Sequence, residues 1–231
     1  MIADLPGIVI PSVAIPPGTA YSEREVQAQR ALLRANGHDD TASGYRGAAR
    51  ADQPALRAAA FALLARDASD DDRVLFAQGA GDSDLAVRAY AAYGLERVAA
   101  GQGVPVLRDV AAHAPGFGEY GPLIAAALLA QLGDASGFPT VERAFATLGE
   151  THPVVDRLWP FARLRVPGVW PLYDRALASS DLVVREQALA QLREVGAPEA
   201  APAVARLLAR LPADDPWAAT VRELASALEG W

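Results

Sequence analysis

A stretch near the middle of the chain, SDLAVRAYAAYGLERV, returns almost 100 residues later as SDLVVREQALAQLREV. Arg88 and Arg185 occupy the same place in the two copies, 97 residues apart. Internal similarity at a fixed period of about 20 to 50 residues is typical of stacked repeats, and this shift divides into three units of about 32. The chain is therefore expected to fold as a solenoid of helical repeats.

The composition fits a helical protein and argues against several classes of function. The net charge is −7 and all 21 basic residues are arginine, so the mean field repels nucleic acid. The longest apolar run, Leu123 to Ala130, is much shorter than the roughly 18 residues of a membrane span. With no cysteine, disulfides and thiolate chemistry are excluded. We expect a cytoplasmic protein, although a mature secreted or periplasmic chain is left open.

The first residues, 1–21, are expected to form an extended arm ahead of a single repeat domain over 22–231. They are apolar, and four prolines fix the backbone and remove donors, at Pro6, Pro11, Pro16 and Pro17. No basic residue precedes Arg24, so the segment is a poor secretory signal. Packing against the first helices or against a partner is expected.

Helical patterning begins at Ser22, which forms a capping box with Glu25. A helix is expected over 22–35, with Gly37 as the stop signal. The residues 36–51 that follow are read as a long loop, either a mobile insertion or a binding loop.

Beyond this loop, two kinds of helix alternate. The first kind carries a proline in its opening turn, where the backbone N–H lacks an acceptor in any case, and it includes Pro105, Pro139, Pro171 and Pro202. The second kind begins with an acidic residue, followed after a gap by an aliphatic residue and an arginine. An alanine follows the arginine after two intervening residues, and a leucine follows the alanine after three more. This pattern occurs in the segments that start at Asp52, Ser83 and Ser180. Its apolar positions form one buried stripe at helical spacing.

These two helix types resemble the A and B helices of HEAT repeats, particularly the short bacterial type. The resemblance covers about 22–229 and implies an all-α fold, a right-handed α-α superhelix of about six helix pairs. The B helices are then expected near 52–66, 83–99, 120–132, 153–165, 181–195 and 215–229. The motif is degraded in the third and fourth pairs, because Pro122 and Val154 replace the arginine. In the family this arginine links Asp-bearing turns of adjacent repeats, so Arg57, Arg88 and Arg185 are structural candidates first.

The repeat register also selects candidate contact residues on the predicted concave face. Tyr90, Tyr93 and Arg97 lie about 100° or more from the buried arc between Val87 and Leu95. Arginine and aromatic side chains supply much of the energy at interfaces, so this face is expected to bind a protein or peptide. A solvated helix face is the competing interpretation. The complete candidate set is Tyr90, Tyr93, Arg97, Gln131, Trp159, Arg163, Gln187 and Glu194.

Catalytic and metal-binding patterns are weak. His38, His113 and His152 are isolated, and none begins an H-E-x-x-H motif. Acidic clusters stand at predicted helix starts, where carboxylates cap free N–H groups, as at Asp70 to Asp72. No catalytic residue, metal or cofactor is therefore predicted.

The function expected first is a non-enzymatic scaffold for a protein partner. HEAT-like enzymes are the alternative, either a bilin lyase subunit or a DNA glycosylase. Metal-dependent hydroxylases need paired His-Glu dipeptides, which the sequence lacks. A third possibility is a structural module of an envelope or secreted assembly, docked through the N-terminal arm.

Overall fold

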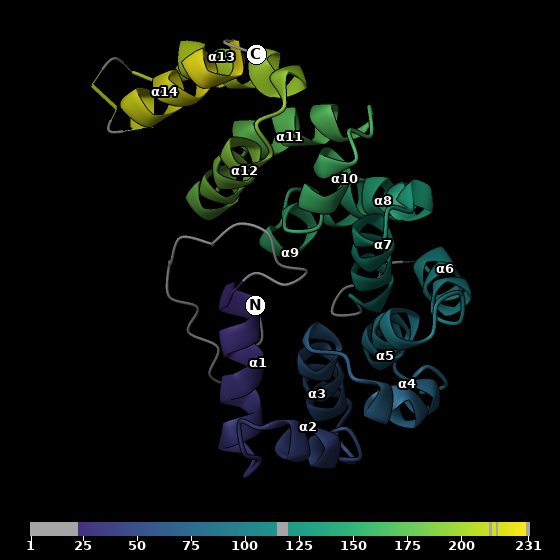
Figure 1. The fold of residues 1–231 in the computed structure, drawn as a ribbon. Helices are drawn as coiled ribbons and strands as arrows, with labels where there is room; N and C mark the ends of the chain where they lie inside the picture. Colours follow the sequence, from purple (N-terminus) through teal and green to yellow (C-terminus); the bar gives the residue numbers. More distant parts are fainter. Residues whose placement is uncertain (1–22, 115–119, 213, 216, 230–231) are drawn as a thin grey trace. The chain divides into compact units, whose positions relative to one another are not determined.

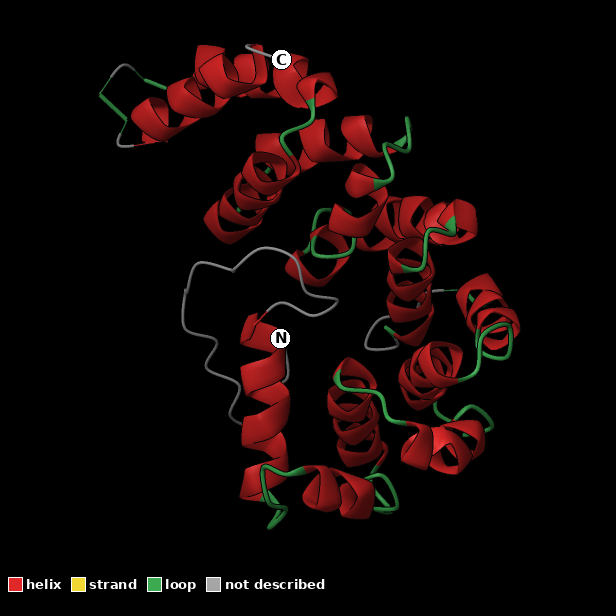
Figure 2. Cartoon of the chain, viewed as in Figure 1, coloured by secondary structure: helices red, strands yellow, loops and turns green. Residues whose placement is uncertain are grey.

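The computed structural model describes residues 23–114, 120–212, 214–215 and 217–229. The predicted arm over 1–21 lies outside this part of the chain. Within it, every regular element is a helix (Figure 2). None of the described helices is both long enough and apolar enough to cross a bilayer. The all-α fold class expected from the sequence is confirmed.

The chain divides into two compact units, Met1–Val106 and Leu107–Trp231 (Figure 1). The first contains α1 (Glu23–Ala35), α2 (Ala42–Ala48), α3 (Pro54–Arg66), the 3-10 turn η1 (Asp70–Asp72), α4 (Arg73–Gly79) and α5 (Leu85–Val98). The boundary falls within α6 (Val104–Ala112). The second contains α7 (Gly121–Gln131), η2 (Ala135–Gly137), α8 (Phe138–Leu148), α9 (His152–Val155), α10 (Trp159–Arg163), α11 (Val169–Ala178), α12 (Leu182–Val195), η3 (Pro198–Ala200), α13 (Ala201–Arg210) and α14 (Trp217–Glu229).

The helix starts form for the local reasons that the sequence suggests. The side chain of Asp84 accepts the backbone N–H groups of Ala86 and Val87 at 2.9 Å, which satisfies two donors at the start of α5. Proline stands in the first turn of α8 and of α13. Five of the six expected B helices match α3, α5, α7, α12 and α14 to within about two residues.

Close packing of α3 and α5 builds the first unit, and it depends on small residues. α3 also packs against α1 and α2, and α5 against α4. A Cβ added at Gly94 of α5 would lie 2.3 Å from the Phe76 ring, and one at Gly79 of α4 would lie 2.4 Å from the Phe61 ring. Glycine is required at both positions because aromatic rings of neighbouring helices fill the space.

The second unit is built as a chain of adjacent pairs. α7 packs on α8 and α10, and α12 packs on α9, α10 and α11. α11 also contacts α13, which in turn packs on α14. Phe138 and Phe161 join α8 to α10, with ring centroids 5.3 Å apart.

The long loop expected over 36–51 is wrong in part, because it contains α2. Thr41 caps this helix, and its hydroxyl oxygen accepts the N–H of Gly44 at 3.1 Å. Arg46 of α2 then forms an ion pair with the buried Asp72, with the guanidinium Nε 2.6 Å from Oδ1. This pair and the packing of α2 on α3 hold a helix too short to be evident from periodicity.

The fourth B helix, expected as one helix over 153–165, is broken into α9 and α10. Pro160 stands in the first turn of α10, after a cap at Leu158. Proline has no N–H to donate to the preceding turn, so a continuous helix would lose a hydrogen bond there.

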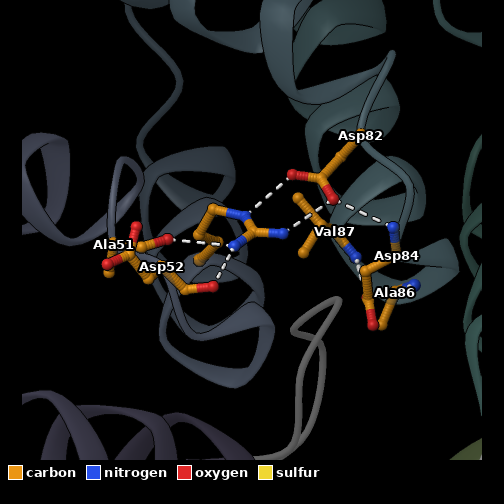
Figure 3. A network of polar contacts seen from close by, with 7 residues as sticks. Ala51, Asp52, Asp82, Asp84, Ala86 and Val87 are labelled. Atoms are coloured by element: carbon orange, nitrogen blue, oxygen red, sulfur yellow. Dashed lines mark hydrogen bonds and ion pairs between the residues drawn. The ribbon is translucent and has the colours of Figure 1, made fainter.

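Arg57 forms the link between Asp-bearing turns that the resemblance implies. Its Nε and Nη2 donate to the two carboxylate oxygens of Asp82 at 2.8 and 2.9 Å. Its Nη1 donates to the carbonyls of Ala51 and Asp52, and Asp82 also accepts the N–H of Asp84 (Figure 3). The two side chains are only 16% and 15% exposed, so this network joins α3 to the turn before α5 in a largely buried setting.

Arg185 departs from that pattern. Its Nη1 donates to the carbonyl of Ser179 at 3.0 Å, and its guanidinium lies 6.0 Å from the centre of the Trp217 ring. An aromatic ring therefore faces this arginine in place of a carboxylate.

Replacing Arg57 with leucine is expected to lower the free energy of unfolding by about 2 kcal/mol, because Asp82 would keep a largely buried, unpaired charge. Urea unfolding followed by circular dichroism measures this change. Arg108→Leu is the matched control, since its ion pair with Asp134 involves an arginine side chain that is 58% exposed. Equal losses in the two variants would contradict the structural role of Arg57.

Acid should weaken the same link. Burial raises the pKa of Asp82, but hydrogen bonds from Arg57 and from the Asp84 N–H outweigh burial and leave that pKa lowered. The stability that the pair adds is therefore complete above about pH 4 and is lost as the pH falls through the lowered pKa of the folded state. Unfolding measured from pH 6 to pH 2 should show a smaller loss in Asp82→Asn than in the wild type; parallel curves would contradict the assignment.

Candidate functional site

The eight residues predicted from the sequence are divided between the two units. Tyr90 and Tyr93 of α5 are only 4% and 7% exposed, so the expectation that they lie on an open face is wrong. The Tyr90 hydroxyl donates to Oε1 of Glu25 at 2.8 Å, and burial raises the pKa of Tyr93 despite the opposing effect of Arg97. The burial follows from tertiary packing, since Glu25 comes from α1, a helix that packs on α3.

Arg97 is exposed, and its guanidinium completes the end of a neighbouring helix. Nη1 donates to the carbonyls of Ala65 and Arg66 at 2.5 Å each, in the last turn of α3. Carbonyls at a helix C-terminus lack intrahelical donors, and a cation there is favoured by the helix dipole.

In the second unit, Trp159 and Arg163 of α10 form a stacked pair. The guanidinium of Arg163 lies 4.9 Å from the centre of the Trp159 ring. Arg163 is exposed and Trp159 half-buried, with a buried indole N–H that has no hydrogen-bond partner among the described residues. Gln131 at the end of α7 and Glu194 of α12 are half-buried. Contact of these residues with a partner stays a prediction.

Gln187 belongs to a set of buried polar residues between α9, α11 and α12, here called the polar cluster. It is 6% exposed, and its Nε2 donates to Oδ1 of Asp156 at 2.7 Å. One turn further along α12, Gln191 is 5% exposed and accepts the hydroxyl of Tyr173 at 2.7 Å. The expectation that Gln187 lies on an open face is therefore wrong, since its amide links α12 to the residue after α9.

Tyr173 is the fully buried member of the polar cluster. Burial, together with the negative charges of Asp156 and Glu194, raises the pKa of Tyr173 well above its usual value. The phenol therefore stays neutral and keeps its hydrogen as a donor to Gln191.

Next to the polar cluster, α12 and α14 enclose two adjoining hollows, here called the terminal groove. Each helix packs on its own A helix, α11 or α13, more closely than on the other. The larger hollow has a volume of about 840 Å³ and the smaller about 200 Å³. Arg193 and Leu224 line both, so the hollows are continuous.

The residues that line the groove come from one face of each helix. Most of those from α12 recur every three or four residues, at Glu186, Leu189, Ala190, Arg193 and Glu194, and Val195 is added at the end of the helix; from α14 they are Trp217, Thr220, Glu223, Leu224, Ala227 and Leu228. Three leucines, at 189, 224 and 228, are at most 6% exposed and form an apolar floor. Charged side chains stand above this floor, so the groove offers apolar contact below and ionic contact above.

Arg165, between α10 and α11, also lines the larger hollow. Its Nη1 is 2.6 Å from Oε2 of Glu199, which fixes the guanidinium and neutralises its charge. Its φ is 53°, the one positive value outside glycine among the described residues. Such a backbone conformation costs about 1 kcal/mol or more and is often found at functional sites.

The charged side chains of the groove interact most strongly with ligand groups in direct contact with them. Its lining holds three glutamates and two arginines, and one of the arginines is paired with Glu199. In water, opposite charges 4 Å apart attract by about 1 kcal/mol, whereas charges 10 Å apart interact by about 0.4 kcal/mol before salt screens them. At physiological ionic strength, where charges are screened over about 8 Å, the repulsion from more distant carboxylates is strongly reduced, and an anion in contact with Arg193 is attracted.

Among the described residues, no group of three or more His, Cys, Asp or Glu side chains is placed to hold a metal ion.

Sequence reasoning missed the terminal groove, although the spacing of its residues was visible. Leu189, Arg193 and Gly196 recur at three- and four-residue intervals, as do Thr220, Leu224 and Ala227. Such a stripe normally packs against the next helix, and nothing in the sequence shows that α12 and α14 leave theirs uncovered.

Comparison with protein-family models finds none that matches the chain, and comparison with curated proteins finds no match. Among solved structures, the chain is similar to the complex of CpcE and CpcF of phycocyanin lyase from Nostoc sp. PCC7120. The sequence identity is 18% and the TM-score 0.47, over 94% of this chain and 97% of that chain.

This finding corrects two expectations from the sequence. The similar structure is a lyase, which contradicts the non-enzymatic protein scaffold and the expectation that the chain is not an enzyme, and it agrees better with the alternative of a HEAT-like enzyme.

Tyr173→Phe is expected to lower the free energy of unfolding by about 1 to 2 kcal/mol, because it leaves the buried oxygen of Gln191 without its donor. Urea unfolding measures the loss. Adding Gln191→Leu should restore part of the stability, since the pair is then replaced by apolar groups. If the loss of stability in the double variant instead equals the sum of the losses in the two single variants, the two side chains do not act as a pair.

Proposed function

We propose that this chain is a HEAT-like enzyme subunit of the bilin-lyase type, and that the terminal groove holds its ligand, an open-chain tetrapyrrole. The observation that carries this proposal is the groove between α12 and α14, with its volume of about 840 Å³, buried leucines below and charged residues above. Ligand sites in proteins are commonly concave, mostly apolar, about 300 to 1,000 Å³ in volume, and equipped with few polar groups.

The chemistry of an open-chain tetrapyrrole suits this lining. Its conjugated rings are flat and apolar, and would lie against Leu189, Leu224 and Leu228. Its ring N–H groups are donors for glutamate carboxylates such as Glu223, and its propionate groups suit an arginine.

The ligand would be held without a covalent bond to a thiol, because the chain has no cysteine. The part of this subunit is therefore to bind and orient the tetrapyrrole, while an acceptor protein supplies any nucleophile. A protein partner accords with the expectation from the sequence, and the exposed Arg163 above Trp159 is available to it.

The assignment to HEAT-like repeats rests on two features. Prolines open the A helices α8 and α13, and Arg57 pairs with Asp82 across a repeat boundary.

The DNA glycosylase alternative is disfavoured by charge: DNA binding needs cationic surfaces, whereas the groove lining has more glutamates than arginines and the whole chain carries −7.

Titration of the protein with biliverdin tests the proposal. The absorbance and induced circular dichroism of the pigment should saturate at one molecule per chain. Ala227→Trp, which fills the groove, should weaken binding by about tenfold or more, since the ligand and the new ring compete for one volume. Because no thiol is present, unfolding in acidic urea should release all the pigment.

Ala205→Trp is the matched control, because Ala205 is exposed on α13 and lies outside the groove lining. Its affinity should equal that of the wild type. Absence of saturable binding, or equal weakening in both tryptophan variants, would remove the basis of the proposed function.

A further inference from the structure

Arg193 stands at the point of the terminal groove where the two hollows meet, and it lines both of them. It is exposed, and it makes no hydrogen bond or ion pair with any residue in the described part of the chain. Its guanidinium therefore keeps five N–H donors in a planar fork that matches a carboxylate.

The other arginine of the groove has a different role. The ion pair of Arg165 with Glu199 uses one side of its guanidinium and cancels its charge. Arg165 is therefore part of the wall, and Arg193 is the arginine whose charge and N–H donors remain available to a ligand.

On the opposite wall, Glu223 of α14 is exposed and also unpaired within the described ranges. Arg193 and Glu223 line the same hollow, yet they form no ion pair with each other. A ligand that carries a carboxylate and an N–H donor can satisfy both walls at once, whereas a ligand with only one of these groups leaves one wall unpaired.

We infer that Arg193 binds a carboxylate of the ligand and makes the groove selective for the acid over its ester. This inference rests on the proposed function, because it assumes that the terminal groove holds an apolar ligand with ionisable arms. The guanidinium can form two parallel hydrogen bonds to a carboxylate, which an ester cannot accept with the same strength. Glu223, on the other wall, receives an N–H donor of the same molecule.

The experiment compares biliverdin with biliverdin dimethyl ester, which has the same rings and no carboxylate charge. In the wild type, the ester should bind about 2- to 5-fold more weakly than the acid. Arg193→Gln should weaken binding of the acid by a similar factor and leave binding of the ester unchanged. Arg222→Gln, which removes an exposed arginine of α14 outside the groove lining, controls for net charge.

The outcomes separate this inference from the proposed function. Equal binding of acid and ester, or an equal effect of the substitutions at Arg193 and Arg222, would overturn the role of Arg193 while leaving the groove as the ligand site. Failure of both pigments to bind, with Ala227→Trp indistinguishable from the wild type, would overturn both.

Discussion

None of the described helices can cover its own apolar surface, and the packing within each unit follows from that constraint. In α7, ten of the eleven residues are buried, from Gly121 to Ala130. α3 and α5 are likewise buried over most of their circumference, which is possible only for a helix with neighbours on several sides. Alanine and glycine at the contacts let the helix axes approach, and the large rings of Phe61 and Phe76 fill the remaining spaces.

The terminal groove is the place where this mutual covering is incomplete. α12 and α14 each pack on an A helix, and their facing sides carry both the leucines of an ordinary contact and charged residues that a closed contact would bury. Burying Arg193 and Glu223 without partners would cost more than the leucine contacts return. The charges therefore disfavour a closed contact between α12 and α14, and in the proposed function the same charges select the ligand.

Much of the fold could be predicted from the sequence because its signals are local. Proline in a first turn and an aspartate cap fix where a helix begins, and the Ala and Leu stripe fixes which side is buried. The remainder depends on contacts between distant residues: α2 is held by Arg46 on Asp72, and Tyr90 is buried under Glu25 of α1. For the site, the sequence selected Glu194 but missed Arg193 beside it, because a stripe does not reveal whether its neighbour is present.

The position of Trp217 gives the protein an internal optical probe. Its indole lines the smaller hollow and lies beneath the guanidinium of Arg185, at the start of α14. Its emission depends on what fills the groove, and a conjugated pigment within a few ångströms would quench it through energy transfer. The chain has three other tryptophans, Trp159, Trp170 and Trp231. A variant that keeps Trp217 and replaces these three with phenylalanine would therefore report occupancy of the groove by ultraviolet fluorescence without an attached label.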